Sequence, residues 1–316
     1  MNDICGNRLF KAVSEVGVWL DSRNVPLYSC RFSPQTYTQH QLLQGLVLKT
    51  LFRLKYRELV ELLQMADSIA DTIGLSKIPH YTTFQKFAAR FPCRILYQLI
   101  QTLAKHICQG TLSLSIDSTG FSLDTSSRYY SHRIKRMERH KSYVKTTLVI
   151  DTKTQAVVSV KPRLKRRHDL VDAEPELRKA AKLGEVKTIV ADKGYDSEHL
   201  LRFIKWELKA KPAISLKYMD KPLNKTYGGL RRSLKRRFPK KLYHQRSKSE
   251  SVNSRIKRMF DSTIRARRNH TKRTETLLKV LAHNLTLKTK VLLEVFYRAQ
   301  TGTRAAGGRT RSPIKA

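Results

Sequence analysis

The chain has 316 residues, 40% of them hydrophobic, which is enough apolar side chain to bury a core in about two domains and argues against a ribosomal tail. Its 63 Lys and Arg against 25 Asp and Glu give a formal net charge of +38, which predicts nucleic acid as a polyanionic partner. No apolar run approaches the roughly 20 residues of a membrane span, and the first residues lack a signal-peptide pattern, which predicts a cytoplasmic protein without a membrane partner.

The first third of the chain is predicted to be helical. Leucines recur at helical spacing over about 39–65, and apolar side chains do so again over 93–108. Between them, Thr82 and Gln85 form a capping-box pattern that predicts the start of a short helix. We interpret 1–109 as a DNA-binding, helix-turn-helix-like region or, with equal weight, as a plain helical bundle. On the first interpretation, the candidate DNA contacts are His80, Thr82, Thr83, Gln85, Lys86 and Arg90.

Beyond Gly110 the hydrophobic pattern alternates as in β-strands. Strands are predicted at 112–117, 143–150, 156–160, 186–192 and 212–216, with helices at 170–183, 197–208 and 273–297. This order predicts an α/β fold, a mixed five-stranded sheet flanked by helices. Functional groups of such sheets collect where neighbouring strands end, and Asp117 and Asp192 occupy two such ends. Residues 300–316 have the composition of a disordered basic tail.

The segment around Glu250 has a helical pattern with two distinct faces. At about 100° per residue, one face within an arc of roughly 60° carries Tyr243, Arg246, Glu250 and Lys257, and another carries Val252, Ile256 and Met259. The first face places one carboxylate among groups that bind phosphate. In a simpler interpretation, Arg246 and Glu250 only form an ion pair between successive helical turns.

Three carboxylates from separate segments predict a metal site. If the helix bearing Glu250 crosses the sheet edge, Asp117, Asp192 and Glu250 converge there. Clustered carboxylates repel one another unless a cation neutralises them, and Mg²⁺ or Mn²⁺ bridges carboxylate and phosphate oxygens. Two such ions about 3.5 to 4 Å apart can activate a water or a 3′-hydroxyl to attack a phosphodiester. We therefore expect these three acids to be metal ligands and catalytic residues, with Asp117 shared between the ions.

The chain resembles the DDE transposases of prokaryotic insertion sequences over roughly residues 110–292. The residues Tyr243, Arg246, Glu250 and Lys257 match the Tyr-x2-Arg-x3-Glu-x6-Lys signature of that group. The segments 114–121 and 192–196 are similar to the family's blocks around its first and second acids. The resemblance implies a ribonuclease H-like catalytic domain over 110–299 with two Mg²⁺ ions, for which Mn²⁺ can substitute. It also implies Asp117, Asp192 and Glu250 as the catalytic triad and Tyr243, Arg246 and Lys257 as contacts to the DNA backbone.

The implied activity is cleavage of transposon ends and their transfer to target DNA. Its partners would be the terminal inverted repeats and a second copy of the chain, as a dimer on paired ends. Two alternatives stay open: a transposase-derived DNA-binding protein without catalysis, and a ribonuclease H-like nuclease that cuts without joining. His168 and Asp169 resemble a pair found in the same enzymes, where Asp169 either shapes the site or caps a helix.

Overall fold

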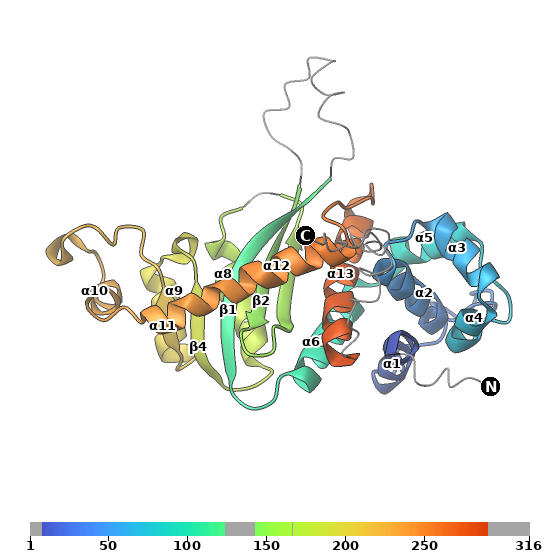
Figure 1. Ribbon diagram of the computed structural model, residues 1–316, viewed down its shortest axis with the longest axis horizontal. Helices are drawn as coiled ribbons and strands as arrows, with labels where there is room; N and C mark the ends of the chain where they lie inside the picture. Colours follow the sequence, from blue (N-terminus) through green and yellow to red (C-terminus); the bar gives the residue numbers. More distant parts are fainter. Residues whose placement is uncertain (1–7, 124–142, 166, 290–316) are drawn as a thin grey trace, which may run out of the picture.

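The computed structural model describes residues 8–123, 143–165 and 167–289, with a five-stranded sheet at its centre (Figure 1). The strands are β1 (Leu112–Ser122), β2 (Tyr143–Asp151), β3 (Val157–Arg163), β4 (Val186–Ala191) and β5 (Lys211–Ile214). They lie in the order β3-β2-β1-β4-β5, in which β2 is antiparallel to both β1 and β3, and β4 is parallel to both β1 and β5. This is the topology of the ribonuclease H-like fold, so the predicted mixed sheet is confirmed.

Within the described part of the chain, six α-helices precede the sheet. They are α1 (Arg8–Ser22), α2 (Gln39–Leu51), α3 (Tyr56–Met65), α4 (Asp67–Ile73), α5 (Tyr81–Arg90) and α6 (Cys93–Ile107). Helices α1 to α5 gather at one end of the molecule, and α6 runs back toward the sheet (Figure 1). The predicted capping box is wrong, because α5 begins at Tyr81 and the Thr82 hydroxyl lies 2.9 Å from Nδ1 of His80 instead of capping the helix.

The later α-helices among the residues described flank or cross the sheet. They are α8 (Leu170–Ala181), α9 (Glu198–Arg202), α10 (Gly229–Arg236), α11 (Lys240–Tyr243), α12 (Ser247–Phe260) and α13 (Asn269–Thr289). The long α12 passes obliquely over β1, β2 and β4 (Figure 1). The final turns predicted for the last helix and the tail at 300–316 lie outside the described residues. None of the helices described is long and apolar enough to cross a membrane.

The two faces of the sheet bury separate sets of side chains. Leu114 and Ile116 of β1 pack into a cluster with α8 and α9, whereas Phe121 packs into a cluster with α12 and α13. Because side chains alternate along a strand, Asp117 points to the same face as Phe121, the face that α12 covers. The second cluster continues through α6 and α2 to α1, so the N-terminal helices share a core with this face. The domain boundary predicted at residue 109 stays a prediction.

Candidate active site

The first two predicted acids occupy equivalent places on neighbouring strands. The parallel pairing of β1 with β4 ends at Ile116 and Ala191, so Asp117 and Asp192 are the next residues on each chain segment. β4 ends at Ala191, one residue before the predicted end at Asp192. The prediction that the first strand ends at Asp117 is wrong, because β1 continues to Ser122 by pairing with β2. Asp117 and Asp192 are nevertheless both the first residues after the parallel pairing of β1 with β4 ends.

Asp117 is held by hydrogen bonds from two sides. The backbone N–H of Ser118 donates to Oδ1 and Nδ2 of Asn253 donates to Oδ2, each over 2.8 Å. Burial raises the pKa of Asp117 to about 6; the Ser118 bond and the charge of Arg246 oppose the rise, and the charges of Glu250 and Asp192 add to it. Asp117 therefore lies within electrostatic reach of both other acids.

Glu250 lies in the first turn of α12, and its side chain is 54% exposed. Its Oε1 is 2.7 Å from Nη1 of Arg246, so the simple ion pair between successive helical turns is present. The helix predicted to run unbroken from Tyr243 is interrupted by a 3₁₀ turn, His244–Arg246, between α11 and α12. The hydroxyls of Ser247 and Ser249 donate to carbonyls three residues earlier, and such bonds compete with regular α-helical pairing.

The three predicted DNA contacts flank the acids. The guanidinium of Arg246 lies 5.8 Å from the ring centre of Tyr243. Partial burial lowers the pKa of Arg246, but the charges of Glu250, Tyr243 and Asp192 outweigh burial and raise it. Burial lowers the pKa of Lys257, and the charge of Asp117 opposes this. Arg246, just before α12, and Lys257, near its end, therefore both interact electrostatically with the acids of the site.

Asn253 is a residue of the site that the sequence did not reveal. It lies three residues after Glu250 on α12, is buried, and donates to Asp117. Its Oδ1 is buried and has no hydrogen-bond partner among the residues described. A polar side chain next to Val252, on the buried face of a helix, is the signal that would have found it.

Asp169 does not cap α8 with its side chain and lies against Lys145 and Ser118. Its Oδ1 lies 2.7 Å from Nζ of Lys145 on β2. Burial favours a higher pKa for Asp169, but hydrogen bonds from Lys145 and Ser118 hold it below the usual value. Asp169 and Lys145 line a hollow of about 480 Å³ beside β1, together with Gly120. The helix-capping role left open for Asp169 is therefore wrong, and its role in shaping the site stays a prediction.

The side chains present offer the hard oxygen donors that Mg²⁺ and Mn²⁺ prefer. The buried Oδ1 of Asn253 has no partner among the residues described, and burial raises the pKa of Asp117. A cation bound next to these two oxygen-bearing side chains would stabilise the folded protein. Within the described ranges, however, no three His, Cys, Asp or Glu side chains meet closely enough to hold a metal ion. Glu250 pairs with Arg246 through Oε1, and binding of one ion by all three acids would require their side chains to move closer together.

The raised pKa of Asp117 predicts a pH-dependent gain in stability for Asp117→Asn. Between the unfolded value near 4 and the folded value of about 6, the folded protein binds more protons, so wild-type stability falls as pH rises through this window. The neutral amide avoids this loss. In EDTA, we expect the variant to exceed wild type by about 1 to 2 kcal/mol at pH 8 and to match it near pH 4, as measured by urea unfolding.

The control for this experiment is Asp71→Asn, which changes an exposed acid on α4. It should show no gain that grows with pH. An Asp117→Asn variant that is equally stable at pH 8 and near pH 4, relative to wild type, would contradict the burial of a charged Asp117.

Comparisons with known proteins identify a family and one similar solved structure. A family model described as "Transposase DDE domain" matches residues 109–285. No protein of curated function matches the chain. Among solved structures, the chain is similar to the one titled "Cryo-EM structure of piggyBac transposase synaptic complex with hairpin DNA", at 10% identity and a TM-score of 0.47. That match covers 92% of this chain and 74% of the other.

Proposed function

The chain belongs to the family of proteins with a transposase DDE domain, and we propose that it cleaves the ends of a prokaryotic insertion sequence and joins them to target DNA. The observation that carries this proposal is the placement of Asp117 and Asp192 where the β1–β4 ladder stops, under the helix that bears Glu250. Sheets of this kind hold functional groups where neighbouring parallel strands stop pairing.

In the proposed site, Asp117, Asp192 and Glu250 would hold two Mg²⁺ ions, for which Mn²⁺ could substitute. When bound, these ions would activate water or a 3′-hydroxyl and stabilise the leaving oxygen. Ser118 and Asn253 orient the Asp117 carboxylate by the bonds they donate to it. Arg246 can form paired hydrogen bonds to a phosphate, whereas Lys257 acts as a point charge. The contribution of the protein is positioning and charge stabilisation, without a protein nucleophile.

The proposed partners are double-stranded DNA and a second copy of the chain. The net charge of +38 supports DNA as substrate, since phosphate neutralisation releases counterions. We propose that the N-terminal helices recognise the terminal inverted repeats and that a dimer holds two ends together. Tyr243, Arg246 and Lys257 would contact the backbone of the end being cut.

The test is an assay with Mg²⁺ on a plasmid that carries the element's inverted repeats. Joined products, identified by sequencing the new junctions, support transposition. Nicks or breaks without joining favour the nuclease alternative, and retention of DNA without cutting favours the DNA-binding alternative. The same reaction in EDTA checks the dependence on a divalent ion, and full activity there would contradict the two-ion proposal.

Lys257→Ala is expected to weaken DNA binding and its salt dependence. Loss of one phosphate contact should reduce the slope of log Kd against log salt by about 0.9 and the affinity at 0.1 M salt by about tenfold. The control is Arg258→Ala, which removes a neighbouring exposed charge on α12. Anisotropy titrations across a KCl series measure both. An unchanged slope for Lys257→Ala would remove this residue from the DNA contacts.

A further inference from the structure

A basic cavity lies where the N-terminal helices meet the loop between α12 and α13, and its lining does not include Asp117, Asp192 or Glu250. We call it the junction groove. Its volume is about 630 Å³, and its walls also include Tyr56, Gln85 and Glu275. The cations that line it are Lys49, Lys55, Lys86, Arg265, Arg267 and Arg268. Six positive charges therefore face a space that contains one carboxylate.

Most of these cations have no anionic partner. Lys55 pairs with Glu58 over 3.0 Å, and Arg265 pairs with Asp261 over 3.3 Å. The other four form no ion pair with any residue that the structure describes. The groove is therefore strongly positive, and repulsion among its cations favours an anionic ligand.

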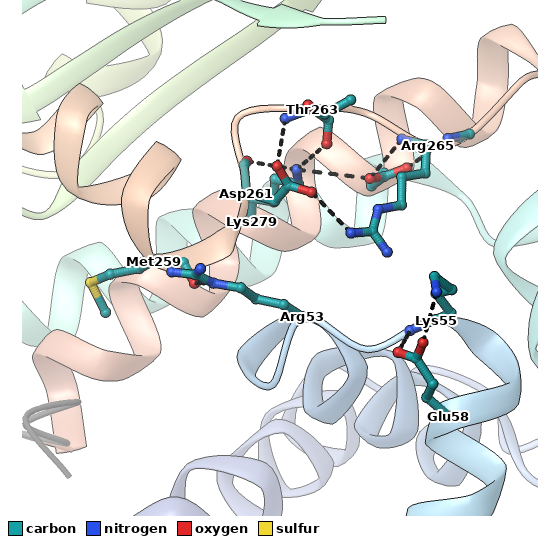
Figure 2. Close-up of polar contacts among 10 residues, drawn as sticks. Arg53, Lys55, Glu58, Met259, Asp261, Thr263, Arg265 and Lys279 are labelled. Atoms are coloured by element: carbon teal, nitrogen blue, oxygen red, sulfur yellow. Dashed lines mark hydrogen bonds and ion pairs between the residues drawn. The ribbon is translucent and has the colours of Figure 1, made fainter. Parts of the chain in front are cut away.

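The arginine wall of the groove is held rigidly from behind (Figure 2). Lys279 on α13 donates from Nζ to the carbonyls of Asp261 and Thr263, over 2.8 and 2.7 Å. Glu275 accepts the backbone N–H groups of Arg265 and of the next residue, over 3.1 and 2.9 Å. Its carboxylate therefore anchors the loop and is less available to neutralise the groove. A fixed loop backbone loses less entropy when a ligand binds to it.

The opposite wall is tied to the last turn of α12, just before this loop. Arg53, in the turn between α2 and α3, donates from Nε to the carbonyl of Met259 over 2.6 Å, so the two walls keep their spacing (Figure 2). On this wall, Nζ of Lys49 lies 4.8 Å from the ring centre of Tyr56. Burial lowers the pKa of Lys49, which indicates a partly desolvated ammonium that an anion would stabilise.

We propose that the junction groove binds the sugar-phosphate backbone of double-stranded DNA, at a place distinct from the catalytic edge. The cations come from three separate segments, at Lys49 and Lys55, at Lys86, and at 265–268, and are therefore spread along the groove. Such a spread suits a run of phosphates better than one small anion. Gln85 and Lys86 are exposed on α5 and reach the groove, so a duplex lying there also meets the helix with the candidate base contacts.

This inference rests on the proposed function, in which DNA is the substrate. The test uses the double variant Arg267→Ala, Arg268→Ala in the full chain, and a random-sequence duplex in EDTA. Both side chains are exposed and unpaired among the residues described, so the fold should be retained, which a thermal melt checks. We expect affinity at 0.1 M KCl to fall by about tenfold or more, and the salt slope to fall by about 1.8, or about 0.9 per lost contact.

The control is Lys182→Ala, Lys187→Ala, which removes two exposed charges at the end of α8 and in β4, on the other side of the molecule from α3 and α5 (Figure 1). It should bind within about twofold of wild type. A groove variant with wild-type affinity and slope would overturn the proposal, and so would equal losses in both variants, because net charge alone would explain them. Binding in EDTA needs no catalysis. Failure of the wild type to cut or join DNA would therefore contradict the proposed function without touching this inference.

Discussion

Glu250→Gln is expected to reduce DNA cutting by at least about a thousandfold and to leave DNA affinity within about twofold of wild type. The carboxylate is 54% exposed at the start of α12, and its bond to Arg246 needs only an acceptor oxygen, which the amide keeps. The substitution removes one negative charge next to Asp117, and so weakens the hold on a divalent ion without adding repulsion toward phosphate. Cleavage of a labelled end fragment in Mg²⁺ and anisotropy in EDTA measure the two effects separately.

A matched control is Glu185→Gln, an exposed acid just before β4. It should cut at the wild-type rate. Cutting by Glu250→Gln within about tenfold of wild type would place the third acidic ligand elsewhere. A parallel loss of DNA affinity would mean that Glu250 acts through the structure of α12 and not at the reacting phosphate.

Asn284→Leu is expected to lower the free energy of unfolding by about 3 kcal/mol or more. Asn284 on α13 is fully buried against the edge strand β3. Its Oδ1 accepts from the backbone N–H of Val157 over 2.9 Å, and its Nδ2 donates to the carbonyl of the same residue over 2.8 Å. Leucine fills a similar volume but makes neither bond. Each backbone group left unsatisfied in a dry interior costs about 1 to 3 kcal/mol.

Urea unfolding followed by circular dichroism measures this loss. The control is Lys288→Ala, an exposed position on the same helix, which should change stability by less than about 0.5 kcal/mol. A loss below about 1 kcal/mol for Asn284→Leu would show that water or another group satisfies Val157, and that α13 does not hold β3 in this way.

The sequence by itself determined which segments form strands and helices and which residue types the site uses. Alternation over 112–116 and helical spacing over 93–107 are properties of neighbouring residues, so β1 and α6 could be predicted from them. The order of the elements then limited the topology to a mixed sheet. The acids Asp117, Asp192 and Glu250 were found from their places on these elements and from motif spacing.

Only the tertiary structure decided which of these residues meet. Asn253 reaches Asp117 across 136 positions, and β1 extends to Ser122 because β2 continues to pair with it. The junction groove likewise combines residues 49–89 with residues 265–275. Such contacts depend on strand register and on how helices pack, and both are set by the burial of side chains distant in the sequence. Local periodicity carries no information about contacts between residues distant in the sequence. The charges of the junction groove could therefore be counted in the sequence, but their gathering in one groove could not be predicted.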